Sequence, residues 1–154
     1  AGQSGFGYGF ATHFSPEPAG PAMQAYREAF RPSEQFPAPH AILGVSVSCA
    51  PTDEQAMELE STMELAWLRI SRGEFLPLPS PEEARAYPWT DAERESLRRS
   101  RGPSVVGDPQ RVCARLHELC AQSGADELMV VTNIWCHELR LQSYRLLASA
   151  WASS

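Results

Sequence analysis

The side chains most suited to chemistry follow a short apolar run late in the sequence. Thr132 and Asn133 come directly after residues 128–131, and His137 lies four residues further on. The apolar run is bounded by a Gly-Ala-Asp turn and by polar residues, which predicts a parallel strand buried on both faces. In parallel α/β proteins, ligands bind at the carboxyl ends of the strands. We therefore expect a ligand site where this strand ends.

The polar residues at this strand end each have a functional and a structural interpretation. Asn133 can donate and accept hydrogen bonds to a ligand, but an Asn at a strand end also forms turns or caps the next helix. His137 can transfer protons near neutral pH, although it can equally cap the last helix. Trp135 lies between them on the same loop.

A second candidate group follows an earlier expected strand. Aromatic and small residues alternate over residues 7–12, and His13 and Phe14 stand at the carboxyl end of this segment. His13 can contact a ligand or cap the following helix. Phe14 beside it can form a pocket wall.

Two serines lie within the strand expected at Ala41–Cys49. Ser46 and Ser48 alternate with valines, so both side chains point to one face. In a barrel this face is the interior, near its mouth. There the two hydroxyls either contact a ligand or fill space and bond to neighbouring backbone.

Helical patterns separate these strands. Periodicity and capping signals predict helices over residues 18–30, 52–72, 108–123 and 137–151. The second should pack an apolar face against a sheet, a face made of Ala56, Leu59, Met63, Ala66, Trp67 and Ile70. The last helix should bury Leu141, Tyr144, Leu147, Ala148 and Trp151.

The segment 73–103 is rich in proline and interrupts this alternation. N-cap signatures predict two short helices inside it, at 81–86 and 91–100. Such an insertion either covers a pocket as a lid or wall, or is a solvated surface excursion.

Bulk composition narrows the class of protein. A chain of 154 residues with 43% hydrophobic residues suits one soluble domain, and a net charge of −6 argues against nucleic acid as a partner. No apolar run approaches a membrane span and no leader pattern is visible, so we expect a cytoplasmic protein without a membrane partner. The cysteines form no CxxC pair and the histidines are scattered, so we expect buried thiols and no metal site.

Four segments together resemble a known family. Residues 10–16 (Phe-Ala-Thr-His-Phe-Ser-Pro), 104–109 (Ser-Val-Val-Gly-Asp-Pro), 124–133 (Gly-Ala-Asp-Glu-Leu-Met-Val-Val-Thr-Asn) and 143–148 (Ser-Tyr-Arg-Leu-Leu-Ala) look like the carboxy-terminal portion of a bacterial luciferase-like, flavin-dependent monooxygenase. The resemblance covers nearly the whole chain, in order and with matching spacing.

The resemblance implies a fold and a chemistry. The fold is a partial (β/α)8 TIM barrel, one segment over residues 1–154 with about three parallel strands, similar to the last three of the barrel, flanking helices and the helical insertion. The activity is oxidation of a small organic substrate by reduced FMN and dioxygen, with the phosphate-binding segment of the flavin site expected before Ala1. Catalytic residues are not identified by the resemblance.

The resemblance also assigns roles to the candidate residues. Those expected to bind the cofactor are His13, Phe14, Thr132 and Asn133. Those expected to line the substrate pocket are Ser46, Ser48, Trp135 and His137.

Two hypotheses follow for the chain as a whole. Three parallel strands leave two open edges and an uncovered apolar face, which a solitary soluble domain tolerates poorly. The first hypothesis is a carboxy-terminal segment of the monooxygenase, inactive without its amino-terminal half. The alternative is a non-catalytic partial-barrel module that binds a partner or self-associates as a homo-oligomer.

Overall fold

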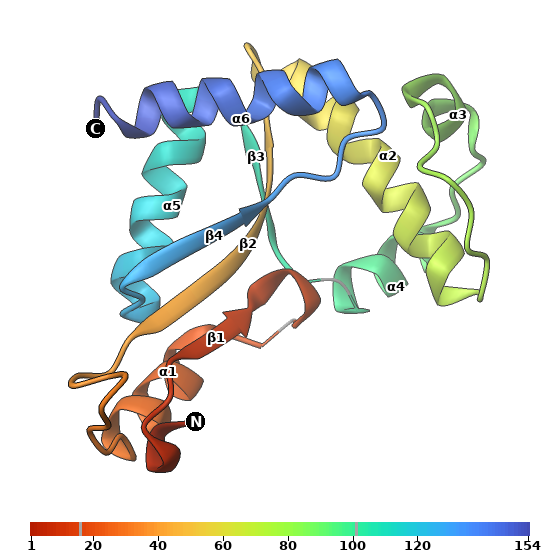
Figure 1. Ribbon diagram of the computed structural model, residues 1–154. Coiled ribbons are helices and arrows are strands. Elements are labelled where there is room, and N and C mark those ends of the chain that lie inside the picture. The colour runs from red at the N-terminus through yellow and green to blue at the C-terminus, as the bar shows by residue number, and fades with distance from the viewer. Residues whose placement is uncertain (16, 101) are drawn as a thin grey trace.

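The computed structural model describes residues 1–15, 17–100 and 102–154 and shows a parallel sheet with helices on both sides (Figure 1). Pro16, at the end of one family motif, and Arg101, inside the expected insertion, lie outside the described residues. Within these ranges the strands are β1 (Tyr8–Ala11), β2 (Ala41–Cys49), β3 (Ser104–Gly107) and β4 (Glu127–Val131). Three of them were expected. The sequence did not indicate β3.

The central strand of the sheet is β2, and each of its pairings is parallel. Residues 41–44 pair with β1, residues 42–46 with β4, and residues 46–49 with β3. Because Ser46 pairs with Ser104 of β3 and with Val131 of β4, these two strands lie on opposite edges of β2. Strands β1 and β3 therefore follow one another along the same edge, and β4 occupies the other.

Helices surround this sheet unequally. A short 3-10 turn, η1 (Gly2–Ser4), precedes β1, and a second, η2 (Thr12–Phe14), follows it. The α-helices are α1 (Ala19–Glu28), α2 (Asp53–Ser71), α3 (Pro81–Ala86), α4 (Asp91–Ser100), α5 (Pro109–Ser123) and α6 (His137–Trp151). Helices α5 and α6 lie on one side of the sheet, whereas α2, α3 and α4 lie on the other side (Figure 1).

The two faces of β2 meet different surroundings. Leu43, Val45 and Val47 are almost fully buried and pack in the main apolar core with Met23 of α1 and Leu116 of α5. We call this the core face of the sheet. Since successive side chains of a strand alternate, Gly44, Ser46 and Ser48 lie on the opposite face, which we call the inner face.

Four of the predicted helix starts are confirmed by their caps. Each cap accepts a hydrogen bond through its side-chain oxygen from the backbone N–H three residues later, and the caps are Thr52, Ser80, Thr90 and Asp108. Pro81 and Pro109 occupy the first turn of the two helices that they begin. The bounds of α2, α3, α4 and α5 consequently match the expected ranges closely.

The expectation that the last strand is buried on both faces is wrong. Leu128 and Val130 pack against the main core, but Met129, which points to the inner face, is 55% exposed. The run of apolar residues correctly indicated a strand. Burial of the inner face of that strand requires other elements to pack on it, and none of the described elements covers Met129.

Helix α6 also buries less than its sequence suggested. Of the expected residues only Leu147 is buried, together with Ser143 on the same face. The remaining four are exposed, namely Leu141, Tyr144, Ala148 and Trp151. In α2 the expected face packs well through Ala56 and Met63, but Ile70 at its end is exposed.

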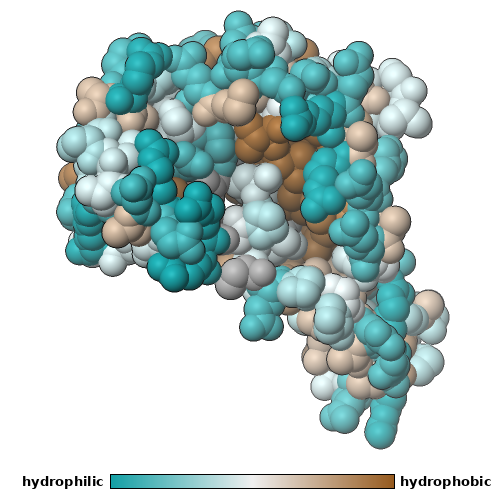
Figure 2. All heavy atoms as spheres, turned by 180° about the vertical axis from the view of Figure 1, so that it is seen from behind, coloured by the Kyte–Doolittle hydropathy of each residue, from teal (hydrophilic) through white to brown (hydrophobic). Residues whose placement is uncertain are grey.

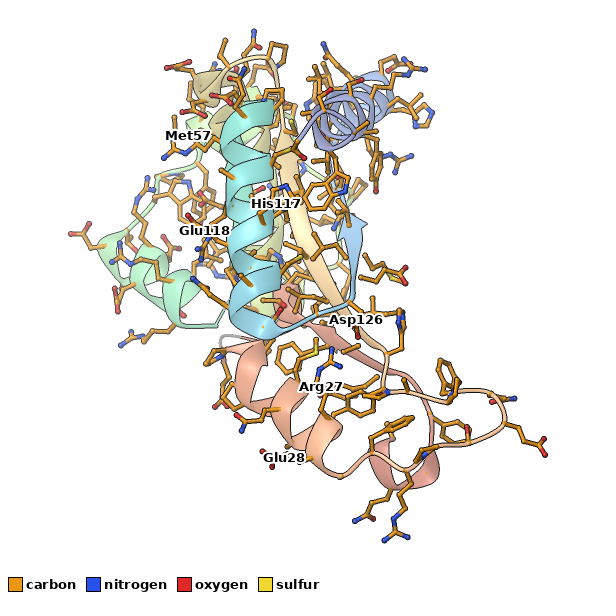
Figure 3. The ribbon with its side chains drawn as sticks, turned by 90° about the vertical axis from the view of Figure 1, so that its left-hand side faces the viewer. Arg27, Glu28, Met57, His117, Glu118 and Asp126 are labelled. Atoms are coloured by element: carbon orange, nitrogen blue, oxygen red, sulfur yellow. The ribbon has the colours of Figure 1, made fainter. Side chains whose placement is uncertain are left out.

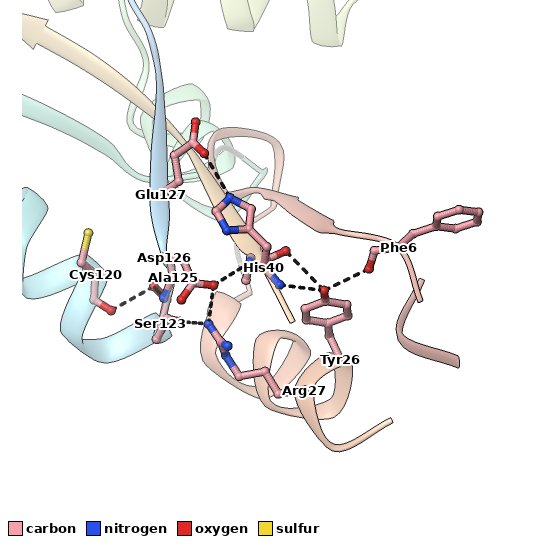
Figure 4. A network of polar contacts seen from close by, with 11 residues as sticks. Phe6, Tyr26, Arg27, His40, Cys120, Ser123, Ala125, Asp126 and Glu127 are labelled. Carbon is pink, nitrogen blue, oxygen red and sulfur yellow. Dashed lines mark hydrogen bonds and ion pairs between the residues drawn. The ribbon is translucent and has the colours of Figure 1, made fainter. Parts of the chain in front are cut away.

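The amino ends of β2 and β4 are held by a polar network that includes α1 (Figure 4). Asp126 accepts hydrogen bonds from the Ala41 backbone N–H and from the Arg27 guanidinium, both at 2.8 Å. Figure 3 shows Arg27 of α1 reaching toward Asp126. Tyr26 Oη accepts from the His40 backbone N–H at 3.0 Å, which fastens α1 to the residue before β2.

Candidate functional site

A small cavity of about 50 Å3 lies where the strands end. It brings together four of the eight predicted site residues: His13, Phe14, Ser46 and Asn133. The other lining residues are Met63, Trp67, Ser104 and Val131. The cavity therefore lies where β1 and β4 end, beside Ser46 within β2 and Ser104 at the start of β3, and α2 closes it on the inner face.

His13 is fixed by a contact with β2 rather than by the helix that follows it. Its Nδ1 lies 3.3 Å from the carbonyl oxygen of Gly44 on the inner face. A carbonyl can only accept, so Nδ1 is the donor in this hydrogen bond. Helix α1 has Pro18 as its N-cap and no side-chain cap. The interpretation of His13 as a helix cap is therefore wrong.

Two aromatic rings continue the wall from His13. The ring centroids of His13 and Phe14 are 4.2 Å apart. The ring centroids of Phe14 and Trp67 of α2 are 6.0 Å apart, in an edge-to-face arrangement. Phe14 is nevertheless 66% exposed, so its ring remains open to a ligand beside the cavity. Aromatic surface of this kind suits a flat, conjugated ligand.

The end of β4 contributes through alternate residues. Val131 and Asn133 line the cavity, and the Asn133 amide is exposed. Thr132 lies between them, is buried and does not line the cavity. Its backbone N–H donates to Tyr144 Oη at 3.1 Å, and its hydroxyl oxygen has no hydrogen-bond partner among the described residues.

The remaining predicted residues are not brought to the cavity. The Ser48 hydroxyl donates to the Glu60 carboxylate of α2 at 2.7 Å, and both residues are buried. Trp135 is 44% exposed on the loop. His137 begins α6, but the N-cap is Cys136 without a side-chain cap bond, so the helix-cap interpretation is wrong. His137 Nδ1 instead lies 2.8 Å from Arg140 Nη2.

A larger recess of about 310 Å3 adjoins the cavity, because Ser104 lines both. Its walls come from α2, from α4 and from the start of β3, through Glu60, Glu64, Leu97, Arg98, Gly102, Pro103 and Val106. Burial raises the pKa of Glu64, and Arg94 counteracts this effect only in part. The predicted insertion thus forms a wall beside the strand ends through α4.

Among the described residues, the cysteines and the possible metal ligands give no second candidate site. Cys49 and Cys113 are buried as expected, and burial raises the pKa of Cys49 to about 11, which keeps it protonated and unreactive. Cys120 and Cys136 are partly exposed. In residues 1–15, 17–100 and 102–154 no three His, Cys, Asp or Glu side chains are grouped to hold a metal ion. Nor does any helix in these ranges combine the length and apolar character needed to cross a membrane.

The cavity also includes residues that sequence reasoning did not select. Met63 and Trp67 were recognised as part of an apolar helix face and interpreted as core. Ser104 belonged to a family motif but not to an expected strand. The alternation of β4 was the one available signal for Val131, since it must share a face with Asn133.

Comparison with known proteins supports the resemblance drawn from the sequence. No protein-family model matches the chain. It is 32% identical over 146 residues to a luciferase-like monooxygenase of Escherichia coli K12, covering 95% of this chain and 44% of that protein. It is 37% identical over 148 residues to the uncharacterized protein YceB of Bacillus subtilis strain 168, covering 96% of this chain and 45% of that protein.

Solved structures agree in fold. The crystal structure of apo-MsnO8 matches with a TM-score of 0.80 at 35% identity, over 97% of this chain and 46% of that one. The monooxygenase RslO1 from Streptomyces bottropensis matches with a TM-score of 0.63 at 17% identity, over 98% and 42% of the two chains, and shows the fold alone.

The chain thus resembles the luciferase-like monooxygenases along nearly its whole length, and the predicted partial (β/α)8 barrel is confirmed. It spans less than half the length of these relatives, as a carboxy-terminal or other partial portion does.

Proposed function

We propose that the chain is the carboxy-terminal part of an FMN-dependent luciferase-like monooxygenase that oxidises a small organic substrate with reduced flavin and dioxygen. In this proposal the inner face at the strand ends forms one wall of the flavin site. The observation that carries it is the convergence of His13, Phe14, Ser46 and Asn133 on one cavity. These side chains come from the ends of β1 and β4 and from within β2, three segments far apart in sequence.

The residues present fit one side of a flavin rather than a complete pocket. A cavity of about 50 Å3 is much smaller than the roughly 300 Å3 or more of pockets for small organic ligands. The ring system must therefore lie against the open side, where Phe14 and Asn133 are exposed. The opposite wall and the phosphate site are expected in the remaining part of the barrel.

Each side chain then has a defined task. The Asn133 amide can donate and accept hydrogen bonds at the ring edge, and Phe14 supplies apolar surface. His13, held by the Gly44 carbonyl, is fixed as part of the cavity wall. Reduced flavin, when bound, supplies the electrons and activates dioxygen, while the protein orients the reactants and excludes water.

Asn133→Ala is the direct test. In a protein that carries this chain with the rest of the barrel, loss of one amide should weaken FMN binding by about 5- to 30-fold, the equivalent of roughly 1–2 kcal/mol. The measurement is a fluorescence titration of FMN. Gln110→Ala removes an exposed amide from α5 and should leave binding unchanged.

The binding measurements distinguish a wrong role for Asn133 from a wrong function for the whole protein. Wild-type affinity in Asn133→Ala would mean that the strand end does not contact the flavin. A complete protein that neither binds FMN nor consumes dioxygen with it would contradict the monooxygenase proposal as a whole.

A second candidate function rests on apolar surface. Met129 on the inner face is 55% exposed, and α6 presents Leu141, Tyr144 and Trp151. Figure 2 shows apolar side chains at the bottom of a hollow between polar parts of the surface. Such surface favours a non-catalytic module that covers it by self-association.

Light scattering distinguishes this module from a part of an enzyme. A uniform dimer of the 154-residue chain, with one cooperative melting transition, is expected of an assembly module. Aggregation, or loss of the cooperative transition, is expected of a barrel segment that needs its other half.

A further inference from the structure

A buried hydrogen bond joins α2 to the inner face of the sheet. The Ser48 hydroxyl donates to Glu60 Oε2 at 2.7 Å, and the two residues are 2% and 6% exposed. A buried hydroxyl and a buried carboxylate each need a partner, because neither can return to water without moving the helix. This contact therefore depends on the position of α2 over β2.

The same face of α2 builds the candidate cavity. Met63 and Trp67 follow Glu60 by three and seven residues, which places all three on one side of a helix. Both Met63 and Trp67 line the cavity, and Trp67 contacts Phe14. A rotation of α2 by one residue, about 100°, would remove Glu60 from Ser48 and turn Met63 away from the strand ends.

The start of α2 has its own, separate attachment. Asp53 accepts a hydrogen bond from the Asp108 backbone N–H at 2.9 Å and pairs with Arg111 at 2.5 Å. These contacts lie two turns before Glu60, so they hold the start of the helix and not the part that faces the cavity. The Ser48–Glu60 bond is a directional contact at that point.

We propose that Ser48 and Glu60 are positioning residues, whose hydrogen bond orients α2 so that Met63 and Trp67 form a fixed apolar wall of the candidate pocket. The pair acts through α2, whereas Met63 and Trp67 meet the ligand. The effect of this wall on substrate binding rests on the proposed monooxygenase function. The effect of the hydrogen bond on the orientation of α2 does not depend on that function.

Fluorine NMR with 5-fluorotryptophan, in a protein that carries this chain with the rest of the barrel, tests the orientation directly. The sequence contains four Trp residues, and the Trp67 resonance is assigned by its loss in Trp67→Phe. Ser48→Ala is expected to shift this resonance by more than its linewidth. Glu60→Gln keeps an amide oxygen that can accept from Ser48, so its resonance should stay near the wild-type position.

Two controls bracket the result. Ser61→Ala removes a hydroxyl from α2 that bonds only to the Glu58 carbonyl and should leave the Trp67 resonance in place. Phe14→Leu removes the ring that contacts Trp67 and must shift it. If Ser48→Ala does not fold, Ser48→Cys, with a weaker donor of similar shape, replaces it in the comparison.

An unchanged Trp67 resonance in the folded Ser48 variant, beside a shift in Phe14→Leu, would overturn the proposal. In the complete enzyme, Ser48→Ala should raise KM several-fold more than it lowers kcat, because the wall orients the substrate. A fall in kcat alone would contradict this positioning role. The NMR result requires neither flavin nor dioxygen, so this proposal and the monooxygenase proposal fail independently.

Discussion

Replacement of Gly102 by alanine is expected to lower the free energy of unfolding by about 3 kcal/mol, at the upper end of the usual range for overpacking. An added Cβ would lie 2.1 Å from the Thr12 carbonyl oxygen and 2.7 Å from the His13 carbonyl carbon. Both are backbone atoms, so no side-chain rotation relieves the overlap. Either the turn after β1 or the segment before β3 must move.

Chemical denaturation measures this effect, with Gly9→Ala as the matched control. Gly9 lies in β1, and an added Cβ there meets no atom within 4 Å, so its midpoint should stay close to that of the wild type. Equal midpoints for the two variants would contradict the close approach of Gly102 to η2. The displacement should also alter the candidate cavity, because His13 and Ser104 both line it.

Local signals predicted much of the fold. The starts of α2, α3 and α5 follow from Thr52, Ser80 and Asp108, each of which caps its own helix through a bond to a residue three positions away. The bounds of β2 match the expected Ala41–Cys49 because its apolar, β-branched run is long enough to be distinctive. Helix caps and long strands depend on residues close together in the chain, so they can be predicted from the sequence.

Strand β3 could not be recognised in the same way. It has four residues, Ser104–Gly107, between a proline and the start of α5. It becomes a strand because β1 turns into η2 at Thr12 and leaves residues 46–49 of β2 without a partner on that edge. This requirement comes from the tertiary arrangement and not from the four residues themselves.

The site was predictable in location and only partly in detail. The rule that ligands bind at the carboxyl ends of parallel strands selected His13 and Asn133, alternation within the strand selected Ser46, and the three converge. The rule did not show which of Thr132 and Asn133 lines the cavity. Alternation along the strand places these adjacent residues on opposite faces, so only one of them can do so. From the sequence, Trp67 and Met63 are predicted to be core residues, because they lie on an apolar helix face. Such a face shows that these residues must be buried, but it does not show whether protein or ligand buries them.

That limit also explains the errors in burial. The apolar stripe of α6 and the inner face of β4 were expected to be buried, yet Trp151 and Met129 are exposed. In the proposed complete barrel these surfaces meet further strands and helices. The apolar patterns therefore predicted burial of these residues, but the elements within this chain do not bury them.

Asp126→Ala is expected to cost about 2 kcal/mol of unfolding free energy, mainly because it leaves a buried backbone donor unpaired. Asp126 accepts from the backbone N–H of Ala41, a fully buried residue, at 2.8 Å. It also pairs with Arg27, which in turn donates to the Gly124 carbonyl oxygen at 2.6 Å (Figure 4). The ion pair is partly exposed, so its Coulomb attraction contributes little.

Glu127→Ala supplies the control at the next position. Glu127 pairs with His40 at 3.1 Å, but its side chain is 54% exposed, so the loss should stay below about 0.5 kcal/mol. Urea denaturation of both variants gives the comparison. If Glu127→Ala were as destabilising as Asp126→Ala, general surface charge rather than the Ala41 amide would be responsible.

The charge of Asp126 adds a dependence on pH. Burial raises its pKa, but the bonds from Ala41 and Arg27 outweigh burial and hold the pKa below its ordinary value of 3.8. A carboxyl whose pKa is lowered by folding contributes its full stability above the unfolded pKa and loses it as the pH falls through the folded pKa. Asp126→Asn keeps an oxygen that accepts from Ala41 and removes only the charge.

The stability difference between wild type and Asp126→Asn should consequently be constant from neutral pH down to about pH 5 and should narrow below 3.8. Urea midpoints measured across this range test the sign. A difference that grew with acidification would mean that burial, which favours the neutral carboxyl, outweighs the Ala41 and Arg27 bonds. The junction of α1 with the amino ends of β2 and β4 would then rest on shape and backbone pairing rather than on this carboxylate.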